Sequence, residues 1–247
     1  MQKEEYQRIY DLEETHWWYL GMRKISKNLL LSVFPGAGNI KILDAGCGTG
    51  GMMIFLKQFG QISGIDLSDE ALKFCQERGL KDVSKSSIEK TPFPDKSFDL
   101  VTSFDVLYHQ WVNNDKAAFN EFFRILKPGG HLLVRVPAYN WLRGKHDNVV
   151  ATKHRYTKSE LAIKAKSSGF LIKRSSYANT FLFPLVILRR LMDKFHFGDK
   201  SSDVQSAPPF INNLLKHILF FEAFLIRKIN LPFGLSVFLL AEKPGKA

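Results

Sequence analysis

A glycine-rich turn between an apolar strand and a helix constrains the fold of this chain more than any other feature. Residues 42–50 read Ile-Leu-Asp-Ala-Gly-Cys-Gly-Thr-Gly. The apolar run 41–43 is typical of a buried parallel strand, and the glycines remove side chains where the strand turns into a helix. A nucleotide-like ligand can therefore approach the backbone closely at Gly46, Gly48 and Gly50.

A second apolar run, 62–67, carries an acidic residue near its end. Asp66 can accept hydrogen bonds from both hydroxyls of a ribose, and Ser68 can cap the helix that follows. Strands and helices then alternate, which indicates an α/β fold with a doubly wound, mostly parallel sheet. The expected strands are 41–46, 61–67, 83–86, 98–104 and 131–137, with helices at 51–59, 69–78 and 115–126.

Two classes of nucleotide site fit this glycine turn. Gly46-x-Gly48-x-x-Gly51, with Asp66 downstream, satisfies the fingerprint of a nicotinamide dinucleotide site. Asp44 favours the other class, because a carboxylate there would repel a pyrophosphate. The same carboxylate can hold the amino group of S-adenosylmethionine, which carries a cation and no phosphate.

Three motifs resemble the class I S-adenosylmethionine-dependent methyltransferases. Residues 44–50, Asp-Ala-Gly-Cys-Gly-Thr-Gly, look like the family's first motif. Residues 91–101, Thr-Pro-Phe-Pro-Asp-Lys-Ser-Phe-Asp-Leu-Val, look like its segment leading into the fourth strand, and 126–130, Leu-Lys-Pro-Gly-Gly, look like its turn into the fifth. The resemblance implies a seven-stranded, Rossmann-like sheet that 170–177 and 235–241 complete, with the final strand antiparallel.

The resemblance also implies S-adenosylmethionine as cofactor. Asp44 and the glycine turn would hold its methionine end, Asp66 its ribose, and Leu67 would flank the adenine. The family often places an acidic residue before the Pro-Phe segment to take the adenine amino group, whereas this chain has Ser87 there, followed by Ile88. Phe104, at the end of the fourth strand, would face the same cleft. The turn residues expected to contact the cofactor are Gly46, Cys47, Gly48 and Gly50.

An aromatic segment precedes this core. Residues 16–19 read His-Trp-Trp-Tyr, and a Gly-x-Arg follows. This pattern resembles the leading segment of a bacterial and archaeal subgroup of these methyltransferases, where it packs over the cofactor cleft. We therefore expect Trp17 or Trp18 to line the cleft and Arg23 to approach the methionine carboxylate. The alternative is that the aromatic residues are simply buried against the sheet.

Histidines are the natural bases near neutral pH. Methyl transfer needs mostly alignment of the acceptor with the methyl carbon, but a hydroxyl acceptor also needs a base to take its proton. The candidates are His109, just past the fourth strand, and His146 and His154 in a loop after the fifth. A metal site built from His146, Asp147 and His154 matches no strong ligand spacing, so we expect no metal.

Composition points to a soluble protein of a reducing compartment. Only two cysteines occur, Cys47 and Cys75, in no metal-like or CxxC spacing, so no disulfide is expected. The first residues are charged, without the apolar segment of a secretory signal. We expect a cytoplasmic protein. The net charge of +11 leaves nucleic acid or an anionic membrane surface open as partners. Basic side chains are concentrated in the second half of the chain, at Arg143, Lys145, Lys153, Arg155, Lys158, Lys164, Lys166, Lys173, Arg174, Arg189 and Arg190.

The chain is expected to form one methyltransferase domain of four parts. These are a helical cap at 1–39, a cofactor-binding core at 40–177, a helical insertion at 178–234 and a last strand within 235–247. The insertion holds apolar segments at 180–197 and 210–229 joined by a polar linker at 198–209. The second segment places Leu214, Phe221 and further apolar residues on one side, with Glu222 elsewhere. Such helices cover a core, form a dimer interface, make a lid over a lipid-like acceptor, or contact a membrane in its plane.

Three functions remain open at this point. The first is O-methylation of a small-molecule, glycan or lipid-like acceptor, which the apolar insertion and the histidine-rich loop favour. The second is methylation of tRNA or rRNA, which the basic charge favours, although no appended RNA-binding module is visible. The third is a non-catalytic cofactor-binding or membrane-surface protein. Either a monomer or a homodimer is compatible with the sequence.

Overall fold

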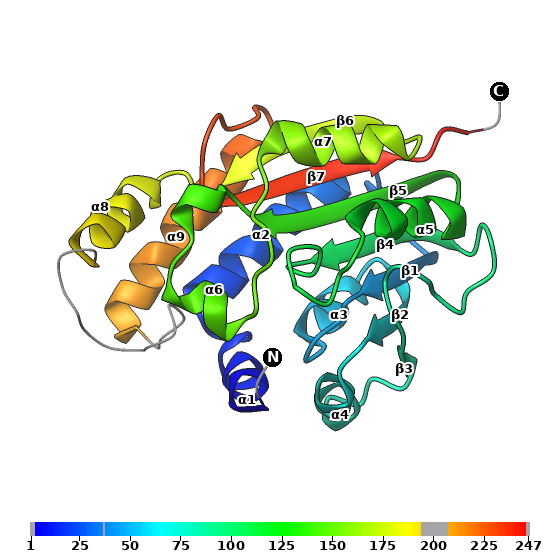
Figure 1. Ribbon diagram of the computed structural model, residues 1–247, viewed down its shortest axis with the longest axis horizontal. Coiled ribbons are helices and arrows are strands. Elements are labelled where there is room, and N and C mark those ends of the chain that lie inside the picture. Colours follow the sequence, from blue (N-terminus) through cyan, green and yellow to red (C-terminus); the bar gives the residue numbers. More distant parts are fainter. Residues whose placement is uncertain (1–2, 37, 194–206, 246–247) are drawn as a thin grey trace.

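Seven strands form one sheet in the computed structural model, which describes residues 3–36, 38–193 and 207–245, without the side chains of residues 145, 146 and 189–193. The strand order is β3-β2-β1-β4-β5-β7-β6 (Figure 1). β7 runs antiparallel to β5 and β6, and the other neighbouring pairs are parallel. The strands are β1 Ile40–Ala45, β2 Gly60–Asp66, β3 Val83–Lys85, β4 Phe98–Phe104, β5 Leu126–Pro137, β6 Leu171–Ala178 and β7 Ser236–Glu242. The predicted seven-stranded, Rossmann-like sheet is confirmed.

Helices connect the strands and begin where the sequence offers caps. The hydroxyl of Ser68 accepts from the backbone N–H of Ala71, and that of Thr157 accepts from the N–H of Glu160. The helices are α1 Lys3–Leu12, α2 Trp17–Leu31, α3 Gly51–Leu56, α4 Asp69–Glu77, α5 Asp115–Ile125, α6 Lys145–Val149, α7 Lys158–Ser167, α8 Phe183–Asp193 and α9 Pro209–Ile226, with a 3₁₀ turn η1 at Asn140–Leu142.

Alternating side chains of the central strands feed two core layers, one on each face of the sheet. On one face, Val101, Val134 and their neighbours pack against α5 and α7. On the other face, Ile42, Leu133 and Phe238 pack against α2 and α9. Figure 1 shows α5 and α7 in front of the sheet and α2 behind it. Both faces are therefore covered, as a mostly parallel sheet requires.

The turn predicted at 126–130 lies within the bounds of β5. Its pairing with β4 jumps from Leu126, opposite Phe98, to His131, opposite Leu100. The Lys-Pro-Gly-Gly residues between them therefore form an irregular segment within the bounds of β5, opposite Asp99 alone. The segment after β5 also differs from the expected open loop, because it contains η1 and α6.

The insertion between β6 and β7 holds α8 and α9, while residues 198–206 of the predicted linker lie outside the described residues. The apolar pattern of the sequence pointed to a face of α9 different from the one that is buried. Leu214 and Phe221 are half exposed, whereas Leu219, Ala223, Ile226 and Glu222 are buried. Glu222 was expected on a polar face. Its carboxylate is buried because it accepts hydrogen bonds from the backbone N–H groups of residues 179–181.

By length and composition, α9 is the single helix in the described part of the chain that could span a membrane. Its inner face nevertheless belongs to the core layer that α2 shares. The carboxamide of Asn212 on α9 also accepts from the backbone N–H of Trp17 at 2.8 Å. These contacts make α9 an integral part of the fold.

Candidate functional site

A cleft of about 1100 Å³ opens at the carboxyl ends of the parallel strands. Ligands gather at this edge in doubly wound folds. Residues that follow β1, β2 and β3 form one side of the cleft, and residues that follow β4 and β5 form the other. The helices α1 and α2 close it from the amino-terminal part of the chain, and Val186 and Ile187 of α8 contribute a further wall.

The glycine turn after β1 depends on backbone angles that other residues adopt poorly. Gly46 and Gly48 have φ values of 87° and 54°. A Cβ at Gly46 would also lie 2.2 Å from a methyl carbon of Val106, so no larger residue fits. At Gly48 nothing lies within 4 Å of the corresponding position, and both residues line the cleft. The turn therefore presents bare backbone to a ligand.

Asp44 stands at the floor of the cleft, 2% exposed. Burial raises the pKa of this carboxyl to about 7. The hydroxyl of Thr102 donates a hydrogen bond to the carboxylate at 2.7 Å, which partly opposes that rise. Such a buried carboxylate gains strongly from a cation placed beside it. The ammonium group of a ligand in the cleft would supply that cation.

Asp66 is fixed at the end of β2 by the backbone around it. Its carboxylate accepts from the N–H of Gly48 at 3.0 Å and from that of Ser68 at 2.9 Å. Burial raises the pKa of Asp66, and these N–H groups oppose the rise. The carboxylate lines the cleft with lone pairs left over, which suits the two hydroxyls of a ribose.

The expected adenine-side residues also lie together. Leu67, Ser87, Ile88 and Cys47 all line this side of the cleft. The hydroxyl oxygen of Ser87 accepts from the N–H of Glu89 at 3.1 Å, which leaves its own proton free to donate. Gly50 is not among the residues that line the cleft; it is the N-cap of α3, in the left-handed conformation with a φ of 86°.

The aromatic segment of α2 forms part of the cleft wall. Trp17, Trp18 and Tyr19 line it, together with Phe104 from β4. Arg23 lies outside the lining, because its guanidinium makes two hydrogen bonds of 2.7 and 2.8 Å to the carboxylate of Glu14.

Glu13 fastens the amino-terminal helices to the glycine turn. Its carboxylate accepts from the hydroxyl of Thr49 at 2.5 Å and from Nη2 of Arg78 at 2.7 Å. Burial raises the pKa of Glu13, and Thr49 and Arg78 oppose the rise. The sequence alone did not identify this contact, since nothing in the local pattern around residue 13 indicates a partner 36 residues away.

Of the two candidate histidines whose side chains the structure describes, His109 lines the cleft and His154 does not. The Nδ1 of His109 lies 2.7 Å from the backbone oxygen of Val150. Because a carbonyl oxygen can only accept, Nδ1 carries the proton and Nε2 is left to accept one. Burial lowers the pKa of His109 to about 4, so the ring is neutral at physiological pH.

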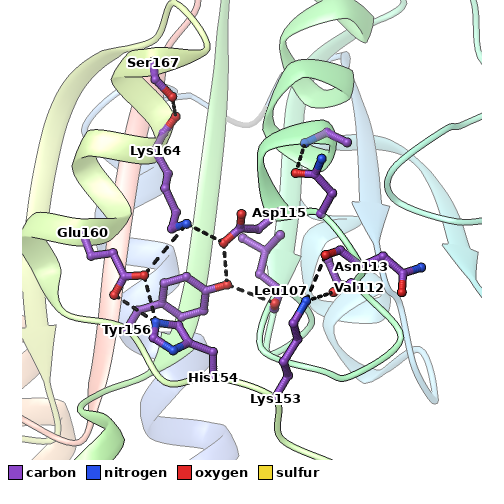
Figure 2. Close-up of polar contacts among 12 residues, drawn as sticks. Leu107, Val112, Asn113, Asp115, Lys153, His154, Tyr156, Glu160, Lys164 and Ser167 are labelled. Atoms are coloured by element: carbon purple, nitrogen blue, oxygen red, sulfur yellow. Dashed lines mark hydrogen bonds and ion pairs between the residues drawn. The ribbon is translucent and has the colours of Figure 1, made fainter.

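His154 serves a different part of the molecule. Its Nε2 lies 2.8 Å from a carboxylate oxygen of Glu160, outside the cleft lining. Figure 2 shows it beside Tyr156, whose single hydroxyl proton is shared between the carboxylate of Asp115, at 3.0 Å, and the backbone oxygen of Leu107, at 3.1 Å. Lys153 donates to the backbone oxygens of Val112 and Asn113. The segment 153–156 thus fastens the loop that carries His109.

The remaining members of the predicted loop contribute no metal centre among the described residues. Asp147 lines the cleft, but both of its carboxylate oxygens accept from the guanidinium of Arg155, at 2.7 and 3.0 Å. The side chain of His146 lies outside the described residues.

Arg135 is a cleft residue that the sequence analysis did not single out. It projects from β5 and donates through Nε and Nη2 to Asp105, while Trp18 and Phe104 stack on its guanidinium at 4.9 and 5.1 Å. Its Nη1 is buried without a hydrogen-bond partner. Its sequence position offered one indication, because Arg135 is a charged residue in the mainly apolar strand 131–137. A charged side chain in a buried strand normally has a charged or hydrogen-bonding partner in the fold.

Comparisons with known proteins match this arrangement. The family described as "Methyltransferase domain" matches residues 43–134. Malonyl-[acyl-carrier protein] O-methyltransferase of Pectobacterium atrosepticum is 32% identical over 111 residues, which cover 44% of this chain and 43% of that protein. The chain thus spans less than half the length of this curated relative.

Solved structures share the fold over most of the chain. A possible histamine N-methyltransferase from Thermotoga maritima matches with a TM-score of 0.60 and 18% identity, covering 97% of this chain and 95% of that one. Phosphoethanolamine N-methyltransferase 2 of Haemonchus contortus, solved with S-adenosylmethionine, matches with a TM-score of 0.57 and 24% identity over 89% of this chain and 52% of that one. With the glycine turn and its flanking carboxylates, these matches place a methyltransferase domain at residues 43–134, on the fold of the solved methyltransferases, and support S-adenosylmethionine as its cofactor.

Proposed function

We propose that the protein transfers a methyl group from S-adenosylmethionine to an oxygen atom of a small, lipid-like acceptor. The observation that carries this proposal is a neutral histidine, His109, at the apolar side of the cleft. Trp111, Trp141, Val186 and Ile187 line the same cleft. An acceptor with an apolar body fits such a wall, and its hydroxyl can be deprotonated at His109.

The carboxylates divide the cofactor between them in this proposal. Asp44 holds the methionine ammonium group, Asp66 accepts from the ribose hydroxyls, and Ser87 donates to the adenine between Leu67 and Ile88. Trp17 and Trp18 cover the methionine end. When bound, the cofactor supplies a methyl group already activated by its sulfonium. Asp44 and Asp66 contribute by fixing the donor, so that catalysis is mainly alignment.

His109 acts on the acceptor. Its Nε2 takes the hydroxyl proton as the acceptor oxygen forms a bond to the methyl carbon and the carbon–sulfur bond breaks. The electron pair of the broken bond stays on sulfur, and the imidazolium returns its proton to water. The low pKa of His109 makes it a modest base, but keeps it unprotonated and ready at neutral pH.

An extract experiment tests this proposal. The protein is incubated with a cell extract and S-adenosylmethionine labelled in the methyl group, and the products are separated into organic-soluble, small aqueous and RNA fractions. We expect label in an organic-soluble product, released by alkali if it is an ester. Label confined to RNA would replace the proposal with an RNA methyltransferase, a reading that the charge of +11 keeps in view.

Variants separate catalysis from binding in the same assay. Asp66→Ala should abolish labelling and cofactor binding together, whereas His109→Gln should reduce labelling and leave cofactor binding intact. If Asp66→Ala turned over like the wild type, the proposed cofactor site would be wrong. Binding of S-adenosylhomocysteine without any labelled product would favour a non-catalytic role.

A further inference from the structure

The outward side of α9 is apolar although it faces solvent. Its inner side, with Leu219 and Ile226, packs into the core that α2 shares. With about 3.6 residues per turn, another set of side chains points the opposite way. Surface helices normally place polar residues there. This outward stripe consists of Phe210, Leu214, Phe221 and Phe224, which are 80%, 52%, 56% and 50% exposed, with the exposed His217 as the polar residue among them.

The apolar surface continues from α9 onto α8. Leu185 and Leu188 of α8 are 62% and 56% exposed, and the ring of Phe181, just before α8, lies 5.8 Å from that of Phe221. We call the outward stripe together with these three residues the α8–α9 face. Figure 1 shows both helices at one end of the molecule, away from β3. Because α8 also lends Val186 and Ile187 to the cleft, one helix separates this face from the cofactor cleft.

Positive charge surrounds the α8–α9 face. The ammonium group of Lys228 lies 5.2 Å from the ring of Phe224, and that of Lys24 on α2 lies 5.9 Å from the ring of Phe220. Arg227 is also exposed at the end of α9. Within the side chains described for α8 and α9, the single carboxylate is Glu222, which is buried. Apolar side chains with a cationic rim, and no exposed acid among the side chains described for the two helices, are the composition of a helix that lies in the surface of an anionic membrane.

We propose that the α8–α9 face docks the protein in the plane of an anionic lipid bilayer. Crossing the bilayer is not required and would break the fold, because Glu222 holds the backbone of residues 179–181 and Asn212 holds that of Trp17. Docking places the α8 wall of the cleft at the lipid surface, where a lipid-like acceptor enters without passing through water. That purpose rests on the proposed function, whereas the docking itself is carried by the face.

Vesicle flotation tests the proposal with the full chain. The probes are vesicles of phosphatidylcholine alone and of phosphatidylcholine mixed with phosphatidylglycerol, each at low and high salt. We expect flotation with the mixed vesicles, and weaker flotation with the neutral ones. Each lysine or arginine at an anionic surface contributes roughly a factor of five in affinity, and salt should reduce that contribution.

Matched variants locate the docking surface. The double variant Phe221→Ser/Phe224→Ser removes apolar area, and Lys228→Gln removes a cation of the rim. Helix α7, on the other face of the sheet, provides controls with the same chemistry, Ile163→Ser and Lys166→Gln, because both residues are exposed there. We expect the phenylalanine pair to lower vesicle affinity about tenfold or more, Lys228→Gln to lower it several-fold, and the α7 variants to float like the wild type.

Two results would overturn the docking surface. One is a wild-type protein that stays with the soluble fraction for every vesicle. The other is equal flotation of the α9 and α7 variants. A stable dimer in sedimentation analysis that the phenylalanine pair dissociates, without vesicle binding, would assign the face to a second copy of the chain and reject the membrane. Calorimetry with S-adenosylhomocysteine keeps the two proposals distinguishable. If the wild type binds vesicles but does not bind S-adenosylhomocysteine, the proposed function is wrong and the docking surface is not.

Discussion

Asp44 shows at the scale of one residue how the fold accepts an unfavourable charge for the sake of a ligand. The unfolded chain ionises this carboxyl near its ordinary pKa of 3.8, and the folded protein near a pKa of about 7. Stability is therefore lost as the pH rises from about 4 to about 7, and the loss persists above that range. A bound ammonium group offsets it.

Removing the charge of Asp44 should stabilise the folded protein and weaken its binding of the cofactor. We expect Asp44→Asn to raise the free energy of unfolding at pH 8 by about 1–4 kcal/mol, because the amide can still accept from Thr102, and to change it little at pH 4. The same variant should weaken S-adenosylhomocysteine about 30-fold or more. Denaturant unfolding at both pH values and calorimetry measure the two effects. A variant less stable than wild type at pH 8 would contradict the buried-charge argument.

His109 and His154 should behave differently when each is replaced by glutamine. His109→Gln is expected to lower kcat about 10²- to 10⁴-fold, the usual contribution of a general base, with the affinity for S-adenosylhomocysteine unchanged. His154→Gln keeps a donor for Glu160 outside the cleft, so it should retain activity. The labelling assay run on the purified acceptor measures both. With the cofactor at saturating concentration, so that protonation of Asp44 does not limit binding, the activity that depends on His109 should persist down to about pH 4, where its imidazole protonates.

Local patterns placed the cofactor side of the site better than the acceptor side. Asp44, Asp66 and the glycine turn follow strand ends, and the carboxyl edge of a parallel sheet collects such residues wherever the rest of the chain goes. Arg135 and Glu13 depend on partners from distant segments, and their neighbours in sequence do not reveal those partners. His154 lies in the loop where an acceptor residue is expected, but its ring turns to Glu160 and away from the cleft.

At the scale of elements, Glu222 connects α9 to the start of α8. Its carboxylate accepts from three backbone N–H groups, those of Asn179, Thr180 and Phe181. Burial raises the pKa of Glu222, and these N–H groups oppose the rise. The carboxylate thus performs for this turn what a capping residue performs for a helix.

Removing this carboxylate should loosen α8 in particular. We expect Glu222→Leu to lower the free energy of unfolding by roughly 2–5 kcal/mol, since it leaves buried N–H groups without partners. Hydrogen exchange should accelerate at residues 179–181 and through α8, more than in β1 or β4. Glu77→Leu, at an exposed position of α4, is the control and should have little effect. Uniform acceleration across the sheet would instead indicate general destabilisation.

The elements themselves followed from periodicity, except where two faces of a helix are both apolar. Apart from β5, which begins at Leu126 instead of the expected residue 131, the strands and the helices α3 to α5 begin within one residue or so of their expected positions, because buried strands and capped helices have strong local patterns. In α9, apolar residues occur on both the inner and the outward side, so the pattern could not tell which side is buried. The choice of the inner face depends on Glu222, a residue that hydrophobic patterning assigns to solvent.

At the scale of the whole molecule, the cofactor should act as a stabilising ligand. S-adenosylhomocysteine at about 100 times its dissociation constant contributes about 2.7 kcal/mol, which for a chain of this size raises Tm by roughly 5–10 °C. NADH should leave Tm unchanged, because Asp44 repels its pyrophosphate. Differential scanning fluorimetry measures both. A rise with NADH and none with S-adenosylhomocysteine would restore the dinucleotide site that the glycine turn alone also allows.

The seven strands and the antiparallel last strand followed from family resemblance, whereas the contact of α1 with the glycine turn did not. Strand order and the antiparallel β7 depend on contacts far apart in sequence, and no local pattern specifies them. The position of α1 across the cleft likewise depends on Glu13 and Arg78, which belong to different elements and meet only in the folded chain.

The link between Glu13, Thr49 and Arg78 has a consequence for the enzyme's cycle. Tyr6 and Ile9 of α1 line the cleft while Glu13, just beyond that helix, is bound to the donor turn. S-adenosylhomocysteine, the product of the cofactor, would leave the cleft past α1. The residue just beyond α1, Glu13, is hydrogen-bonded to the glycine turn that binds this product. We therefore expect a weaker contact between Glu13 and Thr49 to quicken the release of this product.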